Sequence, residues 1–476
     1  MLPYCACADG ANISRIPRTA KTEKTNLVFG IMAPFSLYTT LKRTDFWGRI
    51  ILQRDKEVKG PFGAMSGPAC GMNRGRIPRN FKKRVLPQNV SDILLLKCSK
   101  KEAPLKLYSI IAAACFGALA FGQEPATPAP EIPFDSVPNL LKLPADMYLG
   151  EASGVAINSK KHIFVFTRGN STGPAFGATA AEILEFDPQG KFIREIGHNL
   201  YAWSFAHAIR FDKDDNLWAV DKGSNMIIRF NPEGRVTMTF GRKAEASDEN
   251  AHPLEHPRPP LPAQPGSFRQ PTDVTWDTQG DIFISDGYIN SRVAKFDKNG
   301  DWVKQWGDYT KPEDREHPGQ FELNTPHTIA SDAKGNIYVG DRGNRRIMVY
   351  DPDGNFIREI RINVPPPQVI HPWMGAMPNA QALAAQNGAP WAICITPGPG
   401  TQYLYSADAM PGRIYKLSLE GQVLGVLGSM GHQMKQFGWI HELACPSENE
   451  IYAGELLNWR VQKLILHPGK SATSTN

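Results

Sequence analysis

The stretch that decides the fold reads Thr272-Asp-Val-Thr-Trp-Asp-Thr-Gln-Gly-Asp-Ile-Phe-Ile-Ser-Asp-Gly-Tyr-Ile-Asn-Ser-Arg-Val-Ala-Lys-Phe-Asp-Lys-Asn-Gly-Asp-Trp-Val-Lys-Gln-Trp-Gly307. Short apolar segments alternate in it with turns such as Thr278-Gln-Gly and Lys298-Asn-Gly. Glycine and asparagine adopt the positive backbone angles that tight hairpins need. The stretch therefore predicts four short antiparallel strands, and it lacks the spacing of a helix.

The same unit recurs along the chain. A second clear copy begins His327-Thr-Ile-Ala-Ser-Asp-Ala-Lys-Gly-Asn-Ile-Tyr-Val-Gly-Asp341. Six four-stranded units predict an all-β fold, a six-bladed β-propeller with antiparallel blades. The last unit ends after its third strand, so we expect a segment from Leu140 to Tyr148 to complete its sheet. The six copies begin near Gly154, His207, Thr272, His327, Ala392 and His441.

Charge is unevenly distributed over the 476 residues. Residues 1–122 hold 20 Lys/Arg and 7 Asp/Glu, whereas residues 123–476 hold 33 and 40. The basic character thus belongs to the region before the repeats, and the part expected to fold is acidic. This distribution predicts no nucleic-acid partner, because such a partner needs Lys and Arg gathered on the folded part.

A basic stub, Lys101–Lys106, precedes an apolar run, Leu107–Ala120. Together they are typical of a secretory signal peptide that is cleaved near Ala120–Gly122. The run is shorter than the roughly 20 residues that span a bilayer, so we expect a secreted or periplasmic protein without a stable membrane span. The residues upstream indicate either a start assigned too early or a disordered basic extension. The predicted parts are an extension (1–100), a signal peptide (101–122), a Pro-rich linker (123–139), the propeller (140–467) and a disordered tail (468–476).

Three histidines occupy equivalent positions. His207, His327 and His441 each lie 14 residues before the acid that ends the second strand of their unit. We place Gly154 and Thr272 in the same position of copies one and three. Because the first strand of every blade lines the channel, histidines on alternate blades should converge there. Three neutral imidazoles with an open fourth position are a catalytic zinc ligand set; the alternative is a hydrogen-bonded ring around channel water.

The ends of the second strands add Arg168, Tyr288 and Arg342 to the same rim. We place Arg168 where four other copies have an acid. Two guanidinium groups beside a cation would suit a substrate carboxylate, and a tyrosine near a metal can serve as a base. In the alternative interpretation Tyr288 packs in a turn, and the arginines pair with neighbouring acids such as Asp286 and Asp341.

These motifs resemble the peptidyl-α-hydroxyglycine α-amidating lyase family, which is related to NHL-repeat propellers. The resemblance covers about residues 150–466 and includes the histidine positions. It is carried by Ser153-Gly-Val-Ala, Phe166-Thr-Arg-Gly, Ala206-His-Ala-Ile, Gln270-Pro-Thr-Asp-Val, Ser285-Asp-Gly-Tyr-Ile-Asn-Ser-Arg, Gly319-Gln-Phe, Pro326-His-Thr-Ile-Ala and Asp341-Arg-Gly-Asn.

The resemblance implies a lyase that splits a C–N bond and converts a hydroxyglycine into an amide and glyoxylate. We expect no companion monooxygenase domain, and we therefore expect the hydroxylated substrate to be made elsewhere. The implied substrate is a peptide or small molecule with a C-terminal carboxylate, and we expect a monomer. The implied site consists of zinc on His207, His327 and His441, Tyr288 as general base, and Arg168 and Arg342 at the carboxylate.

The resemblance also implies a structural calcium on the carbonyls of Val155 and Ile209 and the carboxylate of Glu442. Glu442 stands where the family has Asp, and its longer side chain counts against this site. Trp439 stands where animal members have Met near the metal. The cysteines of the animal disulfides are absent, so stability is expected to rest on blade packing.

Two other functions use the same scaffold. A lactonase or another metal-dependent hydrolase would use the zinc to activate water. A non-catalytic propeller would bind peptide or glycan on its rim.

Only Cys394 and Cys445 lie within the repeats, which allows at most one disulfide there.

Overall fold

The structure is a computed structural model that describes residues 126–169, 181–243, 262–373 and 375–468. The predicted extension and signal peptide lie outside the described residues, as does the tail from residue 469. Within the described ranges, no helix is both long and apolar enough to cross a membrane.

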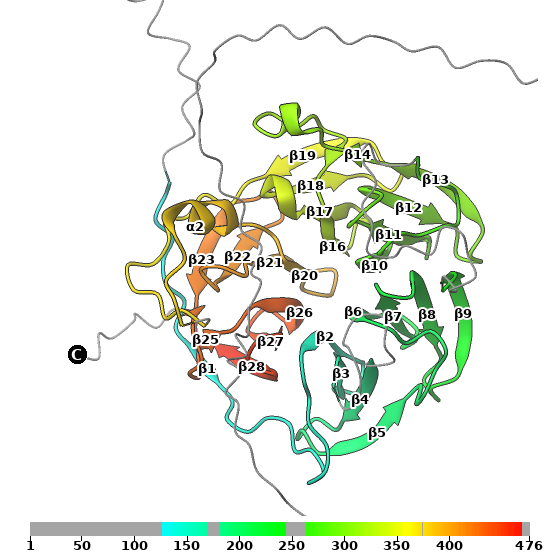
Figure 1. The fold of residues 1–476 in the computed structure, drawn as a ribbon, viewed down its shortest axis with the longest axis horizontal. Coiled ribbons are helices and arrows are strands. Elements are labelled where there is room, and N and C mark those ends of the chain that lie inside the picture. The colour runs from blue at the N-terminus through cyan, green and yellow to red at the C-terminus, as the bar shows by residue number, and fades with distance from the viewer. Residues whose placement is uncertain (1–125, 170–180, 244–261, 374, 469–476) are drawn as a thin grey trace, which may run out of the picture. The chain divides into compact units, whose positions relative to one another are not determined.

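Six four-stranded antiparallel sheets are arranged in a ring around a central axis (Figure 1), which confirms the six-bladed β-propeller. The first three blades are β2(Ala152–Ile157)–β3(Ile163–Thr167)–β4(Glu182–Phe186)–β5(Phe192–Ile196), β6(Ala206–Phe211)–β7(Leu217–Asp221)–β8(Met226–Phe230)–β9(Val236–Gly241) and β10(Asp273–Trp276)–β11(Ile282–Asp286)–β12(Arg292–Phe296)–β13(Trp302–Trp306). The next two are β16(Pro326–Ser331)–β17(Ile337–Asp341)–β18(Arg346–Tyr350)–β19(Phe356–Ile360) and β20(Ala392–Ile395)–β21(Tyr403–Ala407)–β22(Ile414–Ser418)–β23(Val423–Leu427).

The sixth blade is closed by a strand from the start of the described chain. It consists of β26(Ile440–Ser447), β27(Glu450–Glu455), β28(Arg460–Leu466) and β1(Phe134–Ser136). We expected a segment N-terminal to the first blade to complete this sheet, and one does. The prediction that the segment is Leu140–Tyr148 was wrong. Phe134 pairs with Leu466 instead, and Phe134 packs against the hydrophobic cluster between blades five and six. Of the predicted linker 123–139, the segment Phe134–Ser136 therefore belongs to the sheet.

The short elements outside the blades lie in connecting segments. One seven-residue helix, α2(Ala380–Gln386), lies in the insertion before blade five, where no helix was predicted. Its N-cap is Asn379, whose side chain accepts a hydrogen bond from the backbone N–H of Ala382. The others are two parallel pairs, β14(Asp308–Tyr309)–β15(Glu322–Leu323) and β24(Ser429–Met430)–β25(Gln436–Phe437), and two 3₁₀ turns, η1(Pro312–Asp314) and η2(Arg342–Asn344).

In the described part of the chain, six hydrophobic clusters lie one at each junction between adjacent blades, and a small seventh cluster contains Ala389, Trp391 and Ala409. Between blades one and two, for example, Phe166 lies 5.0 Å from Trp203, measured between ring centroids. The second strands are almost entirely buried, whereas the fourth strands, such as β13 and β19, are exposed or half-buried except at their last residue. Burial on both faces requires nearly continuous apolar inner strands, as the repeats have.

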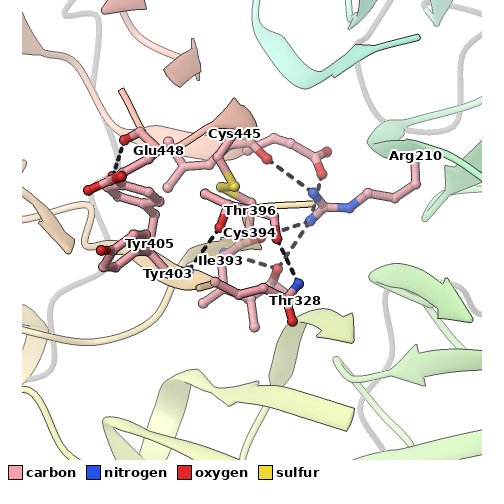
Figure 2. The surroundings of a disulfide bond; sticks show 12 residues. Arg210, Thr328, Ile393, Cys394, Thr396, Tyr403, Tyr405, Cys445 and Glu448 are labelled. Atoms are coloured by element: carbon pink, nitrogen blue, oxygen red, sulfur yellow. Dashed lines mark hydrogen bonds and ion pairs between the residues drawn. A yellow bond between two sulfur atoms is a disulfide. The ribbon is translucent and has the colours of Figure 1, made fainter. Parts of the chain in front are cut away.

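The channel-facing strands of blades five and six are also joined covalently. Cys394 on β20 and Cys445 on β26 form a disulfide, with 6.0 Å between their Cα atoms (Figure 2). This is the one bond that the cysteine count allowed. Because the animal cysteines are missing, we had expected stability to rest on blade packing. The disulfide adds a covalent link between two blades to that packing.

Candidate metal centre

Each of the three histidines is the extra residue of a β-bulge in the first strand of its blade. The strand register shifts between Ala206 and Ala208, and the same shift occurs around His327 and His441. A bulge bends the strand and turns a side chain that would otherwise follow the pleat. The same local distortion, repeated on alternate blades, therefore directs all three imidazoles to one place.

The three imidazoles form a compact, buried cluster. Ring centroids lie 4.7 Å apart for His207 and His327, 4.6 Å for His207 and His441, and 5.0 Å for His327 and His441. One nitrogen from each ring lies within 4.8 Å of the others. The convergence predicted from the repeat spacing is thus present in the fold.

A carbonyl of the next blade fixes the tautomer of each imidazole. A carbonyl oxygen can only accept, so each Nδ1 must carry the proton and each Nε2 keeps its lone pair. Burial lowers the pKa of all three histidines well below the usual value, which keeps the rings neutral. Neutral rings with unprotonated Nε2 atoms and anchored Nδ1 atoms fit a zinc ion. The Nδ1 donors and their acceptors are His207 to Thr272 at 2.6 Å, His327 to Trp391 at 2.7 Å and His441 to Ser153 at 2.8 Å.

Tyr288 follows β11 and places its phenol against this cluster. Its Oη lies 3.4 Å from Nε2 of His207 and 3.2 Å from Nε2 of His327. Burial raises the pKa of Tyr288, but the charges of Arg342, Lys222 and Arg168 outweigh it and lower the pKa overall. The phenol therefore stands where it could take a proton from a group bound at the imidazoles.

The two arginines have different surroundings. Arg168 donates from Nη1 to Glu151 Oε2 at 2.6 Å and from Nε to the carbonyl of Ala206 at 3.0 Å. Arg342 lies over the rings of Trp391 and Tyr288, at 4.0 and 5.4 Å from their centroids. Its Nη1 is buried and has no hydrogen-bond partner in the described part of the chain. An orphaned buried donor is costly, and an anion bound beside it would remove that cost.

The alternative interpretation, in which both arginines pair with acids, holds for Arg168, which pairs with Glu151. Among the described residues, neither arginine pairs with Asp286 or Asp341. Asp286 binds Arg292 at 3.0 Å, and Asp341 binds Arg346 at 2.8 Å. Each acid also accepts a hydrogen bond from a backbone N–H just before the first strand of its own blade, Asp286 from Arg269 and Asp341 from Asn324. These bonds hold the rim in place.

The structure corrects the alignment of the first unit by one residue. Thr167, not Arg168, pairs opposite Ala152, as Asp221 pairs opposite Ala206. Arg168 therefore does not occupy the acid position. It occupies the next one, and Ser153 rather than Gly154 holds the histidine position of blade one.

This correction reveals a residue that the sequence reasoning missed. Lys222 directly follows β7, as Arg168 follows β3 and Arg342 follows β17. The signal was available in the sequence, because Lys222 follows His207 by 15 residues and Arg342 follows His327 by the same interval. The rim thus has three equivalent cations, not two.

Two tryptophans line the other side of the cluster. Trp391 lies 5.0 Å from His327, and Trp439 lies 4.9 Å from Trp391, between ring centroids. Trp439 packs against Trp391 and occupies the position where the resemblance indicated a methionine in animal proteins. The rim therefore has an apolar face beside its cationic face.

The residues implied for calcium do not fit that ion. Glu442 Oε2 accepts from the backbone N–H of Ile209 at 3.2 Å, and its Oε1 forms an ion pair with Arg210 Nη2 at 2.9 Å. The guanidinium group also binds both oxygens of Asp273 and lies beside Thr328 (Figure 2). A dication on Glu442 would be placed next to this buried positive charge. Arg210 thus supplies the cation that Glu442 faces, and the calcium expectation on Val155, Ile209 and Glu442 is not supported.

Curated relatives include amidating enzymes. Peptidyl-glycine α-amidating monooxygenase of Mus musculus is 27% identical over 372 residues, which is 73% of this chain and 34% of the relative. A probable peptidyl-α-hydroxyglycine α-amidating lyase of Caenorhabditis elegans is 27% identical over 217 residues, 42% of this chain and 56% of the relative. NHL repeat-containing protein 3 of Homo sapiens is 26% identical over 189 residues, 37% of this chain and 47% of the relative. The chain spans about a third of the length of the monooxygenases it matches.

No protein-family model matches the chain. Among solved structures, virginiamycin B lyase from Staphylococcus aureus is 14% identical with a TM-score of 0.43, covering 71% of this chain and 100% of that one. The curated homologues thus include peptidyl-α-hydroxyglycine amidating lyases and NHL repeat proteins, which confirms the resemblance seen in the sequence motifs.

Proposed function

We propose that this protein is a metal-dependent lyase that cleaves the C–N bond of a peptidyl- or N-acyl-α-hydroxyglycine to give an amide and glyoxylate. The observation that carries this proposal is the Tyr288 phenol, which lies within 3.4 Å of Nε2 on two of three neutral imidazoles. The named activity of the homologous lyases supports the reaction class.

His207, His327 and His441 would hold the metal, and zinc suits three imidazole ligands. When bound, zinc supplies a Lewis acid that stabilises negative charge on the substrate oxygen. The backbone carbonyls that hold Nδ1 keep the rings oriented for this task, as in other histidine metal sites.

Tyr288 acts as the general base in this proposal. Its lowered pKa increases the fraction present as phenolate, which accepts the proton of the substrate hydroxyl. The electron pair of that O–H bond forms the new C=O bond, and the C–N bond breaks. The amide nitrogen leaves with the C–N electron pair and takes up a proton. The products are an amide and glyoxylate, so no oxidant or water is consumed.

Arg342 binds the substrate carboxylate through its buried Nη1, which has no hydrogen-bond partner among the described residues. The contacts of Arg168 with Glu151 and with the Ala206 carbonyl hold that guanidinium in place at the edge of the site. Trp391 and Trp439 offer an apolar surface for the acyl part of the substrate.

We place this activity outside the cytoplasm, in a secreted or periplasmic monomer. The signal-like segment at residues 101–122 supports export. The Cys394–Cys445 bond supports it too, because disulfides persist in oxidising compartments.

Glyoxylate release from α-hydroxyhippurate by the purified full chain tests the proposal, together with metal analysis of the same sample. His327→Ala should lose both metal and turnover. Tyr288→Phe should keep the metal and lose about 10²- to 10⁴-fold in kcat, the usual size of a general-base effect. Tyr201→Phe, at a tyrosine that is 60% exposed, is the matched control and should change neither.

Each alternative function has a distinct result in this test. Metal binding with lactone hydrolysis and no glyoxylate would favour a hydrolase on the same scaffold. Peptide or glycan binding without turnover would favour a non-catalytic propeller. Normal glyoxylate release by His327→Ala would contradict the metal mechanism.

A further inference from the structure

Lys222 occupies the position after strand two of blade two, equivalent to Arg168 and Arg342 on blades one and four. Its backbone N–H donates to the carbonyl of Phe205 at 3.0 Å, which anchors the turn that carries it. The corresponding bond in blade one runs from Arg168 to Glu151. The repeat therefore brings Lys222 to the same rim as the two arginines.

The Lys222 side chain extends over the face of the catalytic tyrosine. Its Nζ lies 3.8 Å from the ring centroid of Tyr288 and 5.3 Å from that of Phe205. An ammonium group over an aromatic face is held by the quadrupole of the ring.

The three rim cations differ in how they are compensated. Glu151 lies 2.6 Å from Arg168 and neutralises much of its charge. Arg342 has the buried Nη1 without a partner among the described residues. Burial lowers the pKa of Lys222, Tyr288 opposes this shift, and the nearby charges of Arg168 and Arg342 add to it. Such a cluster favours an anionic ligand.

We propose that Lys222 binds the substrate carboxylate together with Arg342, while Arg168 is a positioning residue held by Glu151. This inference rests on the proposed function for the identity of the substrate. It assigns the selection of an anionic C-terminus to a lysine that the family resemblance did not indicate. An ammonium point charge on a flexible stem and a guanidinium fork can share one carboxylate from two sides.

Turnover and binding are both needed to test this assignment. The turnover comparison uses α-hydroxyhippurate and its methyl ester, which lacks the negative charge. Lys222→Met should raise KM for the acid about 10- to 100-fold, the range for one lost charge-assisted hydrogen bond. It should leave KM for the ester within twofold, whereas kcat should change alike for acid and ester because Lys222 also lowers the pKa of Tyr288. Lys222→Arg should restore most of the affinity. Lys243→Met is the matched control, because Lys243 lies on the same blade and binds backbone carbonyls of Tyr201 and Trp203.

Binding of hippurate, which has the acyl group and carboxylate but no hydroxyl, is measured by calorimetry and needs no turnover. We expect Lys222→Met to weaken hippurate binding about tenfold and to leave its methyl ester unaffected. Equal affinity of wild type and Lys222→Met for hippurate, or equal losses for acid and ester, would overturn the assignment. If wild type binds hippurate but releases no glyoxylate from α-hydroxyhippurate, the proposed reaction fails and the Lys222 assignment is still decided by the binding data.

Discussion

Replacing Arg210 with methionine should destabilise the propeller, because this one side chain joins several blades. Arg210 lies on β6 of blade two and donates to Asp273 of blade three at 3.0 and 2.7 Å. It also donates to the carbonyls of Ile393 in blade five, at 3.2 Å, and Leu443 in blade six, at 3.0 Å. The ion pair with Glu442 completes this set. Methionine keeps most of the length and removes every one of these contacts.

The magnitude follows from what each partner retains. Asp273 keeps hydrogen bonds from Thr328 Oγ1 and the Ile329 N–H, both at 3.0 Å. Among the residues that the structure describes, Glu442 keeps only the hydrogen bond from the Ile209 N–H at 3.2 Å, so it becomes a buried carboxylate with almost no compensation. Breaking a buried ion pair by removing one partner costs about 3–5 kcal/mol. At about 2 °C per kcal/mol for a large domain, the melting temperature should fall by about 6–10 °C.

Burial raises the pKa of Glu442 well above the usual value even with Arg210 present. Without Arg210, protonation should relieve part of the penalty, so the loss should be smaller at pH 5 than at pH 8. The double variant Arg210→Met/Glu442→Gln removes the charge and should recover about 1–3 kcal/mol.

The assay is denaturant and thermal unfolding followed by tryptophan fluorescence, with Arg229→Met as control. Arg229 lies on the same blade and bonds Thr237 at its exposed edge, so its loss should cost less than about 1 kcal/mol. Millimolar Ca²⁺ should leave the wild-type melting temperature unchanged. A cost below about 1 kcal/mol for Arg210→Met, or marked stabilisation of the wild type by Ca²⁺, would refute the reasoning.

Four further outcomes are expected. Replacing Cys394 and Cys445 together with alanine should lower the free energy of unfolding by about 2–4 kcal/mol in urea titrations, since the bond closes a loop with a sequence separation of 51. Burial raises the pKa of Asp408 to about 6 from 3.8, so its contribution to stability should fall as pH rises between these values. The stability of wild type relative to Asp408→Asn, measured by unfolding at each pH, should therefore drop by up to about 3 kcal/mol over that interval. Removing metal with a chelator should abolish glyoxylate release while circular dichroism stays unchanged, and added Zn²⁺ should restore turnover. Arg342→Met should raise KM for α-hydroxyhippurate by about 10- to 100-fold, with the methyl ester as the insensitive control.

The sequence predicted the blades and the histidine cluster because both follow from periodicity. Turn residues at regular intervals identify four strands per unit, and six units identify the ring. A side chain at the same place in alternate units must then point to the same end of the channel. His207, His327 and His441 could be placed together without any knowledge of their contacts, although the chain separates them widely.

The error of one residue at Arg168 shows where periodicity fails. The bulge at Ser153 adds a residue to the first strand without any signal in composition, and a one-residue slip exchanges neighbouring positions. The same slip hid the equivalence of Arg168 with Lys222. The closing strand was misplaced for a related reason, since Phe134–Ser136 is too short to show a pattern of its own.

By itself, then, the sequence determined the propeller, its six units and the convergence of three imidazoles with Tyr288 at one rim. Only the tertiary structure decided which charges neutralise one another: Arg168 with Glu151, Arg210 with Asp273 and Glu442, and Lys222 over the tyrosine ring. The physical reason is that repeat spacing fixes the position of a residue around the axis, whereas ion pairing depends on distances of a few ångströms between side chains of different blades.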